Sequence, residues 1–154
     1  MSITNIKDVI EKYPIALSIT VEWIKENSWS AFEQQDQYFN ILFPDITQLT
    51  RKEFLNMRWN ISFLRNVMYA FPTYMLSYGL YFDGTYLQII SAERFITYFI
   101  KSSKDYLRIS RILKLLNALQ FQPQYEALKK LALQVALTYT DIIPENITKL
   151  WAES

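Results

Sequence analysis

The segment "KDYLRISRILKLLNAL" (Lys104–Leu119) has the apolar spacing of an amphipathic helix and an unusual density of positive charge. At 100° per residue, five of its apolar side chains share an arc of about 120°, which is wide enough to face a core. These side chains are Ile109, Ile112, Leu113, Leu116 and Leu119. The pattern predicts a helix from Lys104 to Gln120 with this arc buried.

A second arc of the same helix, about 80° wide, is cationic. It contains Lys101, if the helix begins early, and then Lys104, Arg108 and Arg111, with Lys114 at its edge. Leu107 and Leu115 lie inside or beside this arc. Because an ordinary solvated face would seldom hold two leucines there, we expect this face to contact the chain itself or a partner.

Three interpretations of the cationic arc are open. In the first, Arg108 and Arg111 form partly buried ion pairs with carboxylates such as Glu33, Asp83 or Glu93, and these pairs fix how helices dock. In the second, the start of the helix binds an anion. In the third, the arc is a face for an acidic protein or a nucleic acid, although the net charge of +1 argues against strong nucleic-acid binding.

The anion interpretation rests on the helix dipole. Cations at a helix N-terminus are disfavoured by about 0.3–1 kcal/mol each, and a bound phosphate or carboxylate would reverse that sign. Ser102 or Ser103 could cap the helix or contribute a hydroxyl. The candidate anion or partner site therefore comprises Lys101, Ser103, Lys104, Arg108, Arg111 and Lys114.

The composition favours a helical protein with one core. The chain has 154 residues, of which 51% are hydrophobic, and this length suits a single domain over residues 1–154. Only two glycines occur, whereas sheet proteins use glycine freely in turns and bulges. We expect an all-α, compact, single-domain multi-helix bundle of about six to eight helices.

The first half of the chain shows several helix boundaries. A first helix is expected from Ile3 to Lys12, and a second from Pro14 to Lys25, because proline suits the first helical position. "SAFE" (Ser30–Glu33) matches a capping box and predicts a helix that ends near Phe43.

"TRKE" (Thr50–Glu53) is a second capping box. An apolar stripe with spacings of three and four follows it: Phe54, Met57, Ile61, Leu64, Met68 and Phe71. Core packing is the preferred interpretation of this stripe, and a coiled-coil homodimer is the alternative. Pro72 is expected to kink or restart the helix, which continues to about Tyr78.

"GLYFDGTYLQII" (Gly79–Ile90) is the one place where strands are plausible. Asp83-Gly84 matches a two-residue hairpin turn, and a tight connection between two helices is an equal alternative. Further helices are expected at Ala92–Lys101, Lys104–Gln120, Pro123–Tyr139 and Pro144–Ala152.

The chain lacks the residues that several kinds of catalytic and binding site require. Without histidine or cysteine, the chain has no His-dependent triad, thiol chemistry or usual transition-metal ligands. "GLYFDGTY" has Thr85 and Tyr86 where a phosphate-binding loop needs Lys and then Ser or Thr. Glu33 and Asp36 could pair for acid–base work, but solvated helices often show this spacing. We expect no catalytic residue, no metal and no cofactor.

Three segments carry a family resemblance. "YLRISRILKLLNAL" (Tyr106–Leu119), "WSAFEQQDQYFNILFPD" (Trp29–Asp45) and "YGL" (Tyr78–Leu80) resemble, in the same order, motifs of the opioid growth factor receptor conserved domain. The resemblance spans roughly Trp29 to Leu133, and the Leu-Arg-Ile-Ser-Arg-Ile-Leu match is its most specific part.

The chain also departs from that family. Asp36 and Lys104 occupy about the places of two histidines, and Ile41 replaces a tryptophan. The resemblance implies a helical domain shared by the vertebrate receptor, which is associated with enkephalin binding and the nuclear envelope, and by shorter microbial and fungal proteins. A stand-alone domain is expected to share the fold without that biology.

These observations predict a non-catalytic binding module, with an anion or acidic peptide bound on the Lys104–Lys114 helix. The alternative is an enzyme that acts on a phosphorylated or anionic small molecule through arginines and carboxylates. The partner is expected to be a protein, a peptide or a small anion, a homodimer stays open, and neither nucleic-acid binding nor membrane insertion is expected. The absence of an N-terminal signal-peptide pattern predicts a cytoplasmic protein.

Overall fold

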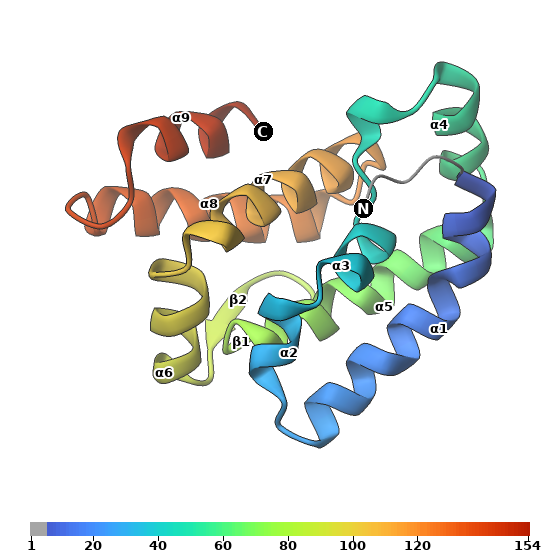
Figure 1. The fold of residues 1–154 in the computed structure, drawn as a ribbon. Coiled ribbons are helices and arrows are strands. Elements are labelled where there is room, and N and C mark those ends of the chain that lie inside the picture. Colours follow the sequence, from blue (N-terminus) through green and yellow to red (C-terminus); the bar gives the residue numbers. More distant parts are fainter. Residues whose placement is uncertain (1–5) are drawn as a thin grey trace. The chain divides into compact units, whose positions relative to one another are not determined.

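The computed structural model describes residues 6–154, and most of them are helical (Figure 1). Within this range the chain forms nine α-helices, two short segments of other helical types and one two-stranded hairpin. The prediction of an all-α multi-helix fold is confirmed. The described residues divide into two compact units, with the boundary between Tyr74 and Met75 inside one helix. The single-domain interpretation stays a prediction.

The first unit contains four complete helices, a short 3₁₀ turn and most of a fifth helix. Their bounds are α1 (Ile6–Lys25), α2 (Trp29–Gln34), α3 (Asp36–Leu42), η1 (Ile46–Gln48), α4 (Arg51–Arg58) and α5 (Ile61–Ser77).

Helix α1 replaces the two helices expected in this region, because it continues through Pro14. Proline removes one main-chain hydrogen bond from a helix. Burial of a whole face offsets that loss, since Val9, Tyr13, Ala16 and Thr20 recur at spacings of four and three and are all buried. The expected start at Ile3 lies outside the described residues.

The predicted capping box at Ser30–Glu33 is wrong. Ser30 lies inside α2, and Ser28 is the N-cap residue without a side-chain capping bond. Aromatic packing explains the earlier start: the Trp29 and Phe32 rings stack at 6.4 Å, and Phe32 is buried edge-on against Trp23 at 5.2 Å. The expected single helix to Phe43 is interrupted at Gln35, which separates α2 from α3.

The capping box at Thr50 is confirmed. The Glu53 amide donates to the Thr50 hydroxyl at 3.1 Å, and the Thr50 amide donates to the Glu53 carboxylate at 3.0 Å. These hydrogen bonds lower the pKa of Glu53, and the bond from the Thr50 main chain has the largest effect.

The apolar stripe that follows is only partly buried. The helix breaks at Trp59 and Asn60, where the Asn60 side chain accepts a bond from the Phe63 amide at 2.9 Å and so caps α5. The break changes the helical phase, so the stripe residues Ile61 and Met68 are exposed. The residues that α5 buries in this unit are instead Phe63, Val67, Ala70, Phe71 and Tyr74.

Aromatic rings fill the core of the first unit. The Tyr13 ring meets Phe63 edge to face at 5.5 Å, and its hydroxyl donates to the Leu42 carbonyl at 2.8 Å. Burial raises the pKa of Tyr13 well above its ordinary value. Tyr74 contacts three further rings at 5.4–5.5 Å: Phe32, Phe39 and Phe43. This ring cluster ties α5 to α2 and α3.

The second unit starts with the end of α5 and continues through a hairpin and four helices joined by a π-helical segment, η2. The bounds are β1 (Leu80–Phe82), β2 (Leu87–Ile89), α6 (Ala92–Arg94), η2 (Phe95–Ile100), α7 (Ser103–Ala118), α8 (Gln122–Thr138) and α9 (Glu145–Glu153).

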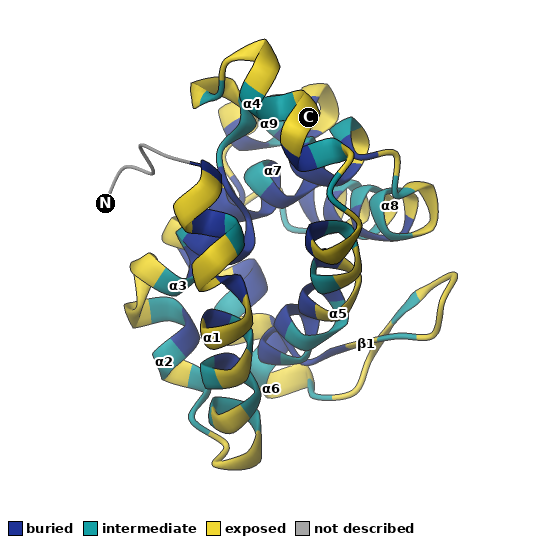
Figure 2. Ribbon diagram, turned by 90° about the vertical axis from the view of Figure 1, so that its right-hand side faces the viewer, coloured by how far each residue is buried: buried dark blue, intermediate teal, exposed yellow. Residues whose placement is uncertain are grey.

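Helix α7 is the most buried helix of this unit, and it packs on α8, α9 and η2 (Figure 2). The five residues of its predicted core arc are all buried. Trp151 of α9 is fully buried against α7, where its indole N–H donates to the Tyr106 carbonyl at 2.9 Å and its ring meets the Tyr106 ring at 5.7 Å. The long helix that defines the sequence pattern therefore forms the centre of this unit.

The hairpin interpretation of residues 79–90 is confirmed, and the helix-connection alternative is not. Strands β1 and β2 are antiparallel, with Phe82 opposite Leu87, so the loop has four residues rather than two. The Asp83 carboxylate closes this loop by accepting from the amides of Thr85 at 2.9 Å and Tyr86 at 2.7 Å. These bonds lower the pKa of Asp83, and the bond from the Tyr86 amide has the largest effect.

Gly79 and Gly84 provide a matched pair of substitutions. Both have positive φ, +72° and +101°, but a Cβ at Gly79 would overlap the Ser91 carbonyl and lie 3.1 Å from the Arg94 Cβ, whereas a Cβ at Gly84 meets nothing within 4 Å. We expect Gly79→Ala to lower the free energy of unfolding by about 1–3 kcal/mol more than Gly84→Ala, because overpacking adds to backbone strain only at Gly79. Urea unfolding of both variants measures this, and equal losses would contradict the packing account.

Candidate functional site

A buried carboxylate, Asp105, lies in the first turn of α7. Its side chain is 2% exposed and pairs with the Arg108 guanidinium at 3.5 Å, the Arg108 side chain being 5% exposed. It also accepts hydrogen bonds from the Tyr78 hydroxyl at 2.7 Å and from the Ser102 hydroxyl at 2.6 Å. We call Tyr78, Ser102, Asp105 and Arg108 the Asp105 cluster.

The first turn of α7 is a favourable place for the buried carboxylate of Asp105. A carboxylate in the first turn is stabilised by the positive end of the helix dipole, and charge-assisted hydrogen bonds offset the desolvation of a buried ion. Ser102 is the N-cap residue, and its side chain binds Asp105 instead of a main-chain amide. The helix therefore carries its own anion at its N-terminus.

The structure separates the predicted site residues by burial. Lys101, Ser103 and Lys104 are exposed at the start of α7, and Arg111 and Lys114 are partly exposed farther along it. Arg108 is buried in the Asp105 cluster. Five of the six residues thus lie on α7 and Lys101 lies just before it; Arg108 is buried, whereas Lys101, Ser103 and Lys104 are exposed.

One buried ion pair of the cationic arc joins Arg108 to Asp105, which is not among the carboxylates predicted from the sequence, and a pair with Glu33 stays a prediction. The Asp105 partner of Arg108 lies one turn earlier on the same helix, so this pair links two residues of α7 rather than two helices. Asp83 binds its own loop instead. Of the two leucines on the cationic side, Leu115 is buried and Leu107 is exposed.

Sequence reasoning missed Asp105, although a signal was present. Ser102 and Asp105 have the S-x-x-D spacing of a helix start, which could have marked the carboxylate as a local acceptor. Tyr78 offered no such signal, because it lies 27 residues away and is brought to Asp105 only by the tertiary fold.

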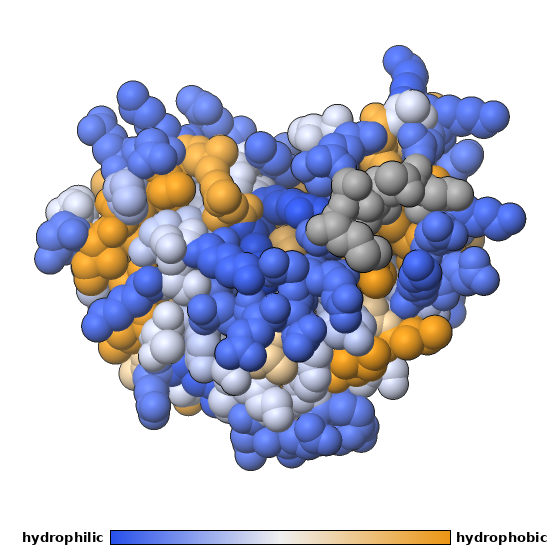
Figure 3. Space-filling view, in the orientation of Figure 1, coloured by the Kyte–Doolittle hydropathy of each residue, from blue (hydrophilic) through white to orange (hydrophobic). Residues whose placement is uncertain are grey.

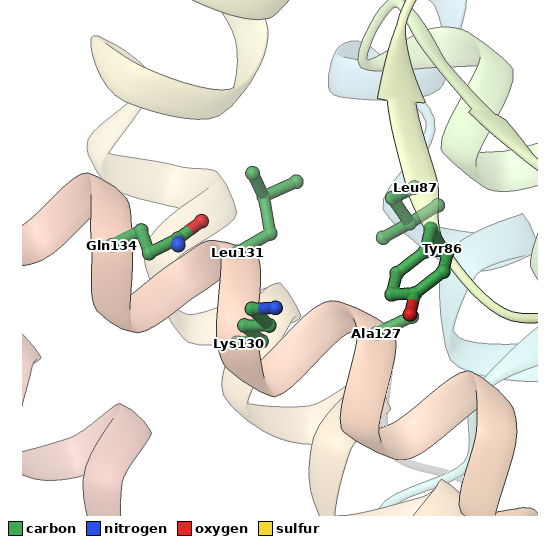
Figure 4. Close-up of a pocket in the computed structure, with 6 residues that line it drawn as sticks. All are labelled: Tyr86, Leu87, Ala127, Lys130, Leu131 and Gln134. Atoms are coloured by element: carbon green, nitrogen blue, oxygen red, sulfur yellow. The ribbon is translucent and has the colours of Figure 1, made fainter.

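A second candidate site is a pocket of about 200 Å³ between the hairpin and α8. Tyr86 and Leu87 form the hairpin side, and four residues of α8 complete the lining: Ala127, Lys130, Leu131 and Gln134. In Figure 4, Leu87 and Leu131 border the same hollow from the hairpin and from α8, and Gln134 lies one turn farther along the helix.

The pocket combines apolar walls with a cation. The Lys130 ammonium lies 5.8 Å from the centroid of the Tyr86 ring, within the range of a cation–π contact. Both side chains are exposed, so both remain accessible to a ligand. Sequence reasoning missed this site, because it joins two segments that are distant in the sequence, Tyr86–Leu87 and Ala127–Gln134.

Among residues 6–154, no three His, Cys, Asp or Glu side chains gather as metal ligands would. None of the described helices has the length and apolar content needed to cross a membrane. In comparisons with known proteins, no family model, curated protein or solved structure matches the chain.

The Asp105 cluster yields a stability prediction. Asp105→Asn keeps the side-chain shape but removes the charge that faces buried Arg108, and we expect a loss of about 3 kcal/mol in the free energy of unfolding. Lys101→Gln, on the exposed side of the same helix start, should change that free energy by less than about 0.5 kcal/mol. Chemical denaturation of both variants measures the difference. Equal, small effects would show that the buried pair contributes little.

Proposed function

We propose that this chain is a non-catalytic binding module that holds a short acidic and partly apolar peptide segment in the pocket between the hairpin and α8. The observation that carries the proposal is the presence of an exposed lysine and an exposed tyrosine around one small hollow that Leu87 and Leu131 also line. The class of function agrees with the resemblance to the opioid growth factor receptor conserved domain, and the site differs from the α7 surface expected from the sequence.

The size of the pocket favours a single side chain over a whole cofactor. Ligand sites for drug-sized molecules and cofactors enclose about 300–1,000 Å³, whereas this pocket holds about 200 Å³. That volume suits one aliphatic or aromatic side chain of a peptide. The rest of the peptide would lie on the surrounding surface.

The lining chemistry favours an acidic neighbour for that side chain. Leu87 and Leu131 offer apolar contact, Lys130 offers an ammonium, and the Gln134 amide can donate a hydrogen bond. A carboxylate one or two residues from the buried side chain would meet Lys130 at the edge of the pocket. Aromatic side chains such as Tyr86 supply contact area at small entropic cost.

The start of α7 is a weaker candidate for the same ligand. Asp105 already compensates the helix dipole there, and Arg108 already binds a carboxylate. An enzyme would be favoured by a cleft in which Arg108, Arg111 and a carboxylate converge on a substrate. The 2% exposure of Asp105 instead keeps the Arg108 pair away from solvent, which supports the module. Cytoplasmic location stays a prediction.

Charge reversal at Lys130 tests the proposal. The probe is a fluorescent hexapeptide with one leucine flanked by glutamates, and its binding is followed by fluorescence anisotropy. We expect Lys130→Glu to weaken binding at least about tenfold, because an attractive charge becomes repulsive inside the contact. Lys149→Glu is the matched control on α9, since Lys149 is also exposed and is absent from the pocket lining.

The uncharged analogue of the probe, with glutamines for glutamates, should bind equally weakly to all three proteins. Equal affinity of wild type and Lys130→Glu for the acidic probe would refute the site. Equal loss in both charge reversals would show that net charge, rather than this pocket, governs binding.

A further inference from the structure

Five apolar residues near the junction of α4 and α5 are exposed. We call Leu55, Trp59, Ile61, Met68 and Tyr69 the α4–α5 face. Trp59 and Ile61 are the most exposed of them, at 74% and 72%, followed by Tyr69 at 62% and Met68 at 52%. Large exposed apolar groups that cluster are typical of interaction sites, whereas single ones need no explanation.

The α5 part of this face is continuous by helical geometry. At 100° per residue, Leu64, Met68, Ile61 and Arg65 lie in that order within an arc of about 100°, and Tyr69 lies at its edge. Figure 2 shows exposed residues alternating with buried ones along α5. By contrast, on the side shown in Figure 3 apolar side chains reach the surface in separate patches between hydrophilic ones, one of them over α1.

Positive charge accompanies the α4–α5 face. Between Ile46 and Phe82 the chain has four cationic residues, Arg51, Lys52, Arg58 and Arg65, and one acidic residue, Glu53. Glu53 lies in the Thr50 capping box and keeps its charge, so four cations and one carboxylate give this segment a net charge of +3. Arg58 lies 5.6 Å from the Trp59 ring centroid, which places a guanidinium beside the most exposed aromatic ring.

We propose that the α4–α5 face docks an acidic amphipathic helix of a partner protein. Ile61, Leu64 and Met68 follow the i, i+3, i+7 spacing by which one helix packs along another. Carboxylates on the partner helix would pair with Arg65, which is exposed on α5. Trp, Tyr, Met and Arg are the side chains enriched in protein interfaces.

Charge distinguishes this partner from the two alternatives. A second copy of the chain, docked symmetrically through α5, would bring like charges of Arg65 and α4 together. A lipid bilayer would have to accommodate Arg65, which lies between Ile61 and Tyr69 around the helix. An acidic amphipathic helix would contact the apolar stripe and also pair with the arginine beside it.

Calorimetry with a designed probe tests the docking surface. The probe is a peptide of about 18 residues, long enough for helix formation, with leucines on one face and glutamates on the other. We expect Ile61→Ser/Met68→Ser to weaken its binding at least about tenfold through the lost apolar contact. Leu107→Ser/Leu137→Ser is the matched control, because both leucines are exposed on other helices.

A charge swap keeps the proposal falsifiable even if the serine variant is poorly folded. Arg65→Glu should lose affinity for the glutamate peptide and gain affinity for the same peptide with lysines, because the sign of the contact is exchanged. Binding of both peptides to wild type with equal affinity would overturn the proposal. It would also be overturned if wild type bound phosphatidylcholine–phosphatidylserine vesicles or formed dimers through these residues but did not bind the acidic peptide.

Discussion

The second unit depends on one buried carboxylate. Asp105 accepts from Tyr78 and Ser102 and pairs with Arg108, so it joins the end of α5, the N-cap and first turn of α7 and the next turn of the same helix. A buried ion is stable only when it is paired and hydrogen-bonded, and here two hydroxyl donors and one guanidinium surround the carboxylate. The Tyr78 bond fixes the end of α5, which is where the chain enters the hairpin.

That constraint affects which surfaces remain for binding. Because Asp105 compensates the dipole of α7 and holds Arg108, the strongest anion-binding features of that helix are already used within the fold. The hairpin is different, since it exposes Tyr86 beside the cation of Lys130. Its shape is maintained by Asp83 within the loop and by Gly79, whose carbonyl accepts from the Ile90 amide at 2.8 Å. One wall of the pocket is therefore supported by hydrogen bonds within the hairpin, made by the Asp83 side chain and by the main chain.

Local sequence signals predicted those parts of the fold that local energetics decide. The core arc of α7, the capping box at Thr50 and the helix starts near Pro123 and Pro144 follow from spacing and from proline geometry, and the structure has them. The hairpin was one of two alternatives, since Asp83-Gly84 suits either a turn between strands or a connection between helices.

Features that tertiary packing decides were not predictable in this way. Helix α1 continues through Pro14 because its buried face is stabilising, and α5 changes phase at Asn60, so the apolar stripe from Phe54 to Phe71 does not form one buried face. The cationic residues of α7 were visible, but burial of Arg108 depends on Asp105 and Tyr78 together. The pocket at Tyr86 and Lys130 requires two distant segments, and no pattern of spacing identifies it.

The most direct test of this account is a titration of the ¹⁵N-labelled chain with the glutamate-flanked leucine hexapeptide, followed by two-dimensional NMR of the backbone amides. If the Asp105 cluster is structural and the pocket binds the ligand, the largest shift changes should occur at Tyr86, Leu87, Lys130 and Leu131, with little change at the start of α7. Largest changes at Ser103 and Lys104 would contradict the account, because they would show that the start of α7 binds the anion despite the carboxylate buried beneath it.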